Sequence, residues 1–139
     1  YKLSTKEDLD LTTLIPTNPA TATSTTAGSQ IVVNDLNMSD ASAQAVTISL
    51  NDVLQLGSTN AFDKSGNYSG DLQMRVSGAA NDTVRLSSSD GWKLLANTVV
   101  QLHDDPSNAA ITHGYRVYTD STGRVDLFIQ EQITQVNFL

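Results

Sequence analysis

Residues 115–130 read Tyr-Arg-Val-Tyr-Thr-Asp-Ser-Thr-Gly-Arg-Val-Asp-Leu-Phe-Ile-Gln, and this stretch decides the fold class. Apolar and polar side chains alternate in both of its halves, which is the period of a β-strand with one buried face. The turn residues 120–123, Asp-Ser-Thr-Gly, stand between the halves. Such residues tolerate positive φ or hydrogen-bond to their own backbone. The stretch therefore predicts a β-hairpin.

Short β-like runs of the same kind continue back to Gln30, separated by turn residues. Many short strands at a spacing of about 8 to 15 residues are typical of an all-β sandwich or barrel. We expect a β-sandwich with Greek-key-like connections and about eight or nine strands. The predicted strands are residues 31–33, 45–48, 72–77, 83–86, 92–95, 98–102, 111–118, 124–130 and 133–138.

One short helix is predicted over residues 50–56, between two of these strands. Ser49 is a favourable N-cap with Asp52 three residues later, and Gly57 supplies a stop. Trp92 directly follows a tight turn and is expected inside the core rather than exposed as a platform for a sugar. The expected core consists of Leu50, Val53, Leu54, Leu56, Val76, Val84, Leu86, Trp92, Val117, Val125, Leu127 and Ile129.

The chain divides into an N-terminal arm, residues 1–29, and a β-sandwich module, residues 30–139. Residues 17–29 consist almost wholly of Thr, Ala, Ser, Asn and Pro and are expected to form a linker. The apolar residues of the arm allow two roles. The arm can complete its own sandwich as an edge strand, or it can cross to a neighbouring copy and link subunits into a fibre.

The local structure of the arm is left open between a helix and a strand. Ser4 and Glu7 have the spacing of a capping box, which predicts a short helix before Pro16. The alternation of Leu9 and Leu11 equally suits an extended strand.

Composition narrows the function classes. The net charge is −7, and the acids are 13 Asp against 2 Glu, which favours turns and strands over helices. The 8 Lys and Arg residues are scattered, so we expect no nucleic-acid partner. No run of about 18 apolar residues exists, so we expect no membrane insertion. The absence of cysteine is compatible with a bacterial surface protein that is stabilised without disulfides. The acidic surface is compatible with a protein that is exposed to extracellular calcium.

A calcium site is predicted in the glycine-bent loop that carries Asp63, Asn67 and Asp71. These three oxygen-bearing side chains recur at a spacing of four, and oxygen atoms are the ligands that Ca²⁺ takes. Ordinary Asx turns account for the same residues. The adjacent pair Asp104 and Asp105 is a weaker candidate for a metal site.

A ligand site is predicted on the long loops, residues 58–70 and 103–112. Tyr68 and the neighbouring Asn67 lie on a loop expected to be exposed, where binding residues concentrate. We expect them to contact a glycan or a peptide.

Catalysis is not expected. The chain has no G-x-S-x-G motif, and its two histidines, His103 and His113, flank a predicted hairpin loop. They could meet across that hairpin and bind a metal, but solvated positions at the strand ends are favoured.

Several separated pieces also resemble one known kind of module. They are residues 48–56 (Ile-Ser-Leu-Asn-Asp-Val-Leu-Gln-Leu), residues 72–86 (Leu-Gln-Met-Arg-Val-Ser-Gly-Ala-Ala-Asn-Asp-Thr-Val-Arg-Leu), residues 91–92 (Gly-Trp) and residues 114–118 (Gly-Tyr-Arg-Val-Tyr). Together they resemble a module of giant RTX-type adhesins, which Gram-negative bacteria export by type I secretion. The resemblance covers about residues 45–131.

The resemblance implies an extracellular structural or adhesive module at the bacterial cell surface or in a biofilm matrix, whose partners are neighbouring modules or copies of the same protein. The chain departs from the family pattern by an insertion at residues 58–70 and a long connection at residues 103–112. The calcium-binding nonapeptides of RTX β-rolls are absent, so their metal sites do not carry over.

Overall fold

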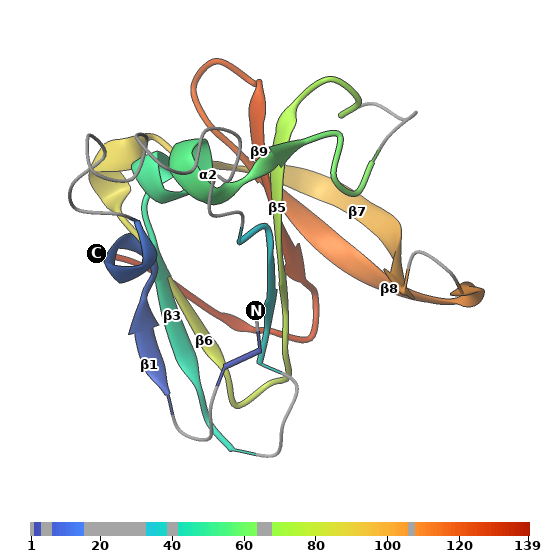
Figure 1. Ribbon diagram of the computed structural model, residues 1–139, viewed down its shortest axis with the longest axis horizontal. Helices are drawn as coiled ribbons and strands as arrows, with labels where there is room; N and C mark the ends of the chain where they lie inside the picture. The colour runs from blue at the N-terminus through green and yellow to red at the C-terminus, as the bar shows by residue number, and fades with distance from the viewer. Residues whose placement is uncertain (1, 4–6, 16–32, 39–41, 64–67, 106–107) are drawn as a thin grey trace, which may run out of the picture.

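The chain folds into a mostly β structure with two sheets, one parallel and one mixed (Figure 1). The prediction of a mostly β fold with two sheets is confirmed. One α-helix and two short 3-10 helices accompany the strands in the part of the chain that is described. The computed structural model describes residues 2–3, 7–15, 33–38, 42–63, 68–105 and 108–139.

The parallel sheet contains four strands, in the order β1 (Asp8–Asp10), β3 (Ala45–Ile48), β6 (Thr83–Leu86) and β10 (Gln135–Phe138). Both β3 and β6 begin and end at the predicted residues, because each is an alternating run between turn residues. One row of side chains faces the other sheet. The register aligns Leu9, Val46, Val84 and Val136 along it.

The mixed sheet has the order β2 (Asp35–Asn37), β5 (Leu72–Ser77), β9 (Val125–Gln130), β8 (Asn108–Thr119) and β7 (Lys93–Asp105), with β4 (Ser58–Thr59) paired to β5. The strands β2, β5 and β9 are parallel, whereas β8 and β7 are antiparallel to their neighbours. Most of the strand predicted at 31–33 lies outside the described residues.

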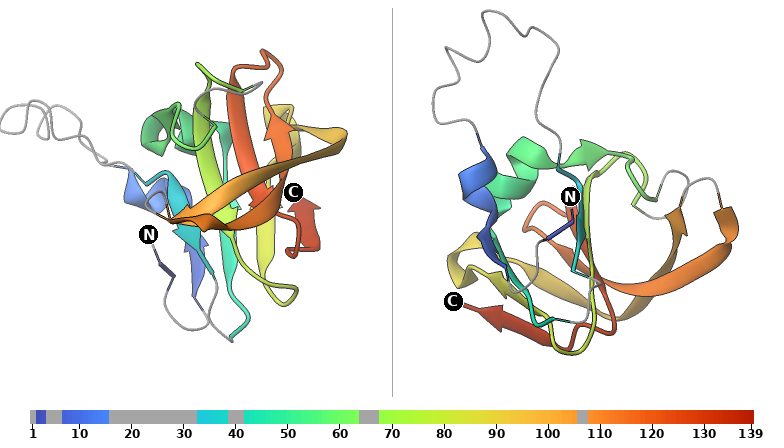
Figure 2. Two further views of the ribbon diagram at one scale, coloured as in Figure 1. Left: turned by 90° about the vertical axis from the view of Figure 1, so that its right-hand side faces the viewer. Right: turned by 60° about the horizontal axis from the view of Figure 1, so that its bottom comes forward.

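The chain alternates between the two sheets (Figures 1 and 2). It passes from β2 to β3, from β5 to β6 and from β9 to β10, each time from the mixed sheet to the parallel sheet. Lys2 forms a parallel bridge with Asn37 and leads into β1 in the same way. Successive turns of the chain therefore stack as in a solenoid. This corrects the expected Greek-key-like connections, which require antiparallel neighbours.

Two insertions interrupt this path, and the first contains helix α2 (Leu50–Leu56). The predicted helix is confirmed: Ser49 Oγ accepts a hydrogen bond from the Asp52 backbone N–H, and the Asp52 carboxylate accepts one from the Ser49 N–H, at 3.1 and 2.8 Å. Leu54 is 51% exposed, so its assignment to the core is wrong. A helix of seven residues that packs on one side leaves the opposite side in solvent.

The second insertion is the β7–β8 hairpin, which extends away from the stacked turns (Figure 1). The hairpin predicted over residues 115–130 is formed by the next pair, β8 and β9, which are antiparallel. Its turn places Gly123 at a φ of 73°. The Asp120 N–H donates to the Val125 carbonyl at 3.1 Å.

The main core fills the space between the two sheets, and a second apolar cluster lies on the outer face of the mixed sheet. Tyr118 and Trp92 belong to the main core, as predicted for Trp92. The second cluster consists of Leu102, Tyr115, Val117 and Phe128. The strand β9 contributes side chains to both clusters, and all of its residues are buried.

The arm contributes to the core of its own chain. Its residues Leu3, Leu9 and Leu11 are buried in the main core, and β1 pairs with β3. The extended alternative is confirmed at Leu9, which lies in β1, whereas the 3-10 helix that follows, η1 (Leu11–Leu14), is capped by Asp10 and not by Ser4. The linker predicted at residues 17–29 lies outside the described residues. Within the described part, no helix is long and apolar enough to span a membrane.

Candidate functional site

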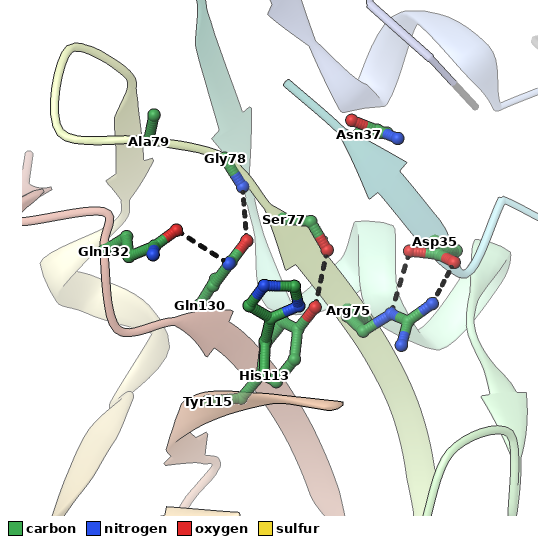
Figure 3. A pocket seen from close by; sticks show the side chains of 10 residues that line it. All are labelled: Asp35, Asn37, Arg75, Ser77, Gly78, Ala79, His113, Tyr115, Gln130 and Gln132. Carbon is green, nitrogen blue, oxygen red and sulfur yellow. Dashed lines mark hydrogen bonds and ion pairs between the residues drawn. The ribbon is translucent and has the colours of Figure 1, made fainter. Parts of the chain in front are cut away.

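A polar pocket of about 330 Å³ lies on the outer face of the mixed sheet (Figure 3). Its lining comes from β2, β5, β8 and β9 and from the turns that follow β5 and β9. Side chains of a strand alternate between its two faces, so the lining residues within β2, β5 and β8 are two positions apart. The lining residues are Asp35, Asn37, Arg75, Ser77, Gly78, Ala79, His113, Tyr115, Gln130 and Gln132.

An ion pair forms one wall of the pocket. Arg75 donates from Nε and Nη2 to the two carboxylate oxygens of Asp35, at 3.1 and 2.6 Å. Its Nη1 donates to the His103 carbonyl at 2.7 Å. The guanidinium carbon lies 4.6 Å from the centre of the Phe62 ring and 5.6 Å from that of Tyr115. Arg75 is thus held rigidly, while the Asp35 side chain is 40% exposed.

Amides and hydroxyls form the opposite wall (Figure 3). Gln130 accepts a hydrogen bond from the Gly78 N–H at 3.0 Å and donates to the Gln132 side-chain oxygen at 2.9 Å. Ser77 Oγ and the Tyr115 hydroxyl lie 2.8 Å apart. These hydrogen bonds fix the polar groups before any ligand arrives, which lowers the entropic cost of binding.

The residues of the predicted metal loop do not converge on one point. Asp63 accepts a hydrogen bond from the Tyr68 N–H at 3.1 Å and thereby closes the loop. Asp71 lies instead beside Asp126 of β9. Asn67 lies outside the described residues. Among the described residues, no three His, Cys, Asp or Glu side chains are grouped so that they could hold a metal ion.

Asp126 is a buried acid that the sequence did not single out. Burial, followed by the hydrogen bond and charge of Asp71, raises the pKa of Asp126 to about 8. Only 1% of its surface is exposed. The alternation of β9 places it on the outer face, but the sequence gives no sign that this face is covered.

The predicted ligand residue Tyr68 packs inward. Its ring meets the Phe128 ring at a centroid distance of 5.8 Å, and burial raises the pKa of its phenol. Tyr68 is only partly exposed and helps to cover the outer face of the mixed sheet. The other candidates, Asp104 and Asp105, lie at the end of β7, and their side chains lie outside the described part.

The two histidines do not share a site. His103 pairs with Thr112 and His113 pairs with Leu102, so the two rings project from opposite faces of the hairpin. His113 lines the pocket.

The sequence did reveal one signal for the pocket. Gln73, Arg75 and Ser77 alternate with apolar residues in β5, which places a row of polar side chains on the outer face. The remaining lining residues come from distant strands and carry no motif. A scan against protein-family models and searches of curated proteins and of solved structures found no match.

Proposed function

We propose that the chain is a structural or adhesive module of a bacterial extracellular surface or matrix protein, exported by type I secretion. The observation that carries the proposal is the stacking of successive turns of the chain into two sheets. In such an architecture each turn is stabilised by its neighbours. The partners of the proposed module are neighbouring modules or further copies of the chain. The resemblance to RTX-type adhesin modules supports the same assignment.

Mechanical unfolding tests the structural role. Two copies of the chain are joined in tandem between reference domains and stretched by atomic force microscopy. We expect each copy to unfold in a single force peak and to refold on relaxation, because the two sheets share one main core. Unfolding in many small steps at forces below those of the reference domains would contradict a structural role under load.

A glycan-binding role is the second candidate, and the polar pocket favours it. Ligand pockets commonly combine a few fixed polar groups with aromatic surface. The pocket offers the Asp35 carboxylate and the amides of Asn37, Gln130 and Gln132, with Tyr115 among them. Such planar polar groups suit the neighbouring hydroxyls of a neutral sugar. This pocket, rather than Tyr68, would supply the contacts.

A glycan and peptide array tests this second candidate. We expect binding to short glycans that falls at least tenfold, about 1.4 kcal/mol, in Gln132→Ala and Asn37→Ala. The control is Gln55→Ala, an exposed glutamine of α2 outside the pocket. If the chain bound no glycan on the array, or if all three variants bound equally well, the proposal that the pocket binds glycans would be wrong. Peptide binding that depends on the same residues would identify a peptide as the ligand.

A further inference from the structure

The β7–β8 hairpin leaves the plane of the mixed sheet and bends toward β5 on the outer face. In the order of the sheet, β9 and β8 lie between β5 and β7. Three strand spacings in a flat sheet would separate β5 from β7 by roughly 14 Å. Nevertheless, Nη1 of Arg75 on β5 lies 2.7 Å from the His103 carbonyl oxygen on β7. The hairpin therefore approaches β5 through space and not through the sheet.

A bulge in β7 accounts for this bend. The register between β7 and β8 shifts between Leu94 and Val99, and a bulge bends its strand and increases the local twist. Asn97, inside the bulge, has a φ of 59°, a conformation that asparagine adopts more readily than most residues. Beyond the bulge, residues 99–103 of β7 pair regularly with residues 112–116 of β8. We call these two runs the bent half of the hairpin.

Arg75 joins the bent half to the rest of the sheet by directional bonds. Its Nε and Nη2 donate to both carboxylate oxygens of Asp35 on β2, which fixes the plane of the guanidinium group. The third donor, Nη1, is thereby aimed at the His103 carbonyl. The rings of Phe62 and Tyr115 lie beside the same guanidinium group. The Arg75 side chain is only 5% exposed, so water competes little for these bonds.

The position of the bent half determines the shape of the pocket. His113 and Tyr115 belong to the bent half and line the same pocket as Asp35 of β2, although β5 and β9 lie between β2 and β8 in the sheet (Figure 3). The apolar contacts that Leu102 makes in the second cluster are not directional and permit several positions. The bond from Arg75 to a backbone carbonyl specifies one of them.

We infer that Arg75 is a positioning residue, which holds the bent half of the hairpin at the distance from β5 at which the pocket forms. It acts through the His103 backbone, so the imidazole of that residue is not needed. Arginine is required, because the single ammonium group of lysine cannot bind a carboxylate through two nitrogens and a carbonyl through a third. The effect on ligands rests on the glycan-binding role proposed above, whereas the effect on the hairpin does not.

The distance between two nitroxide spin labels tests the effect on the hairpin. The chain has no cysteine, so Gln101→Cys in the bent half and Gln55→Cys on α2, both at exposed positions, place the labels. Pulsed electron paramagnetic resonance should give one narrow distance distribution when Arg75 is present. In Arg75→Met and in Arg75→Lys this distribution should broaden and shift, while circular dichroism shows that the protein is still folded. The matched control, Arg85→Met, removes the ion pair with Asp8 in the parallel sheet and should leave the distribution unchanged.

Each outcome of the distance measurement decides the inference. An unchanged distribution in a folded Arg75 variant, or an equal change in Arg85→Met, overturns it. If neither Arg75→Met nor Arg75→Lys folds, the side chain serves the stability of the whole chain, and the inference is overturned as well.

The glycan array measures the consequence for binding. We expect both Arg75 variants to bind the glycans recognised by the wild type about tenfold more weakly or worse, and Arg85→Met to bind them as the wild type does. If the wild type binds no glycan, the glycan-binding role fails, while the spin-label distances still decide the positioning role. A broadened distribution with undiminished glycan binding overturns the link between the hairpin and the pocket.

Discussion

Asp126 couples protonation to folding. Burial first, and then Asp71, raises the pKa of Asp126 from 3.8 to about 8. Between these two values the folded chain holds a proton that the unfolded chain has released. Its contribution to the free energy of unfolding is therefore fully present below about pH 4 and is lost as the pH rises through about 8.

Removing this acid should flatten the pH dependence of stability. We expect the wild type to lose stability between about pH 4 and about pH 8, and Asp126→Asn to lose less. Asp71, Asp120 and Tyr68 also face this site and are present in both proteins, so the difference between the proteins isolates Asp126. Urea unfolding across the pH range measures it. Parallel stability profiles would contradict the assigned pKa.

The helix α2 separates exposed from buried leucines within one element. Leu56 is 1% exposed and Leu54 is 51% exposed. We expect Leu56→Ala to lower the free energy of unfolding by about 2 to 5 kcal/mol, because it leaves a cavity in the main core. Leu54→Ala should change it by less than about 0.5 kcal/mol. Chemical denaturation measures both, and equal losses would contradict this orientation of the helix.

Elements with local determinants could be predicted from the sequence. The helix α2 begins at its N-cap Ser49, and the strands β3, β5 and β6 are bounded by turn residues on both sides. The error at Leu54 arose because the neighbouring leucines fit a helical stripe, whereas the main core lies on one side of a short helix. Local patterns specify which residues are apolar but not how wide the buried face is.

The arrangement of the strands in the whole molecule could not be predicted in this way. The alternation of apolar and polar residues along a strand indicates which side chains share a face, but it is the same whether the neighbouring strand is parallel or antiparallel. The pocket has the same limitation, because Asp35, Arg75 and Gln130 meet only once β2, β5 and β9 lie side by side. Asp126 was missed because its cover comes from a segment far away in the chain.

The arm should matter for the stability of the single chain. Leu11 is fully buried, and it follows the strand β1 that pairs with β3. We expect Leu11→Ala to lower the free energy of unfolding by about 2 to 5 kcal/mol. Thr13→Ala, at an exposed position of the same 3-10 helix, is the control and should cost far less. If Leu11→Ala left unfolding unchanged but altered assembly, the arm would act between copies instead.

The parallel pairing also has a consequence for the order in which the molecule folds. Among the described strands, only the antiparallel pairs β4–β5, β7–β8 and β8–β9 join strands that follow each other along the chain. Every parallel pair joins distant segments, such as Leu72 with Val125, and closing so long a loop costs entropy before any contact compensates. The hairpins are therefore free to form early, whereas the sheet containing β10 is completed only after nearly the whole chain is in place.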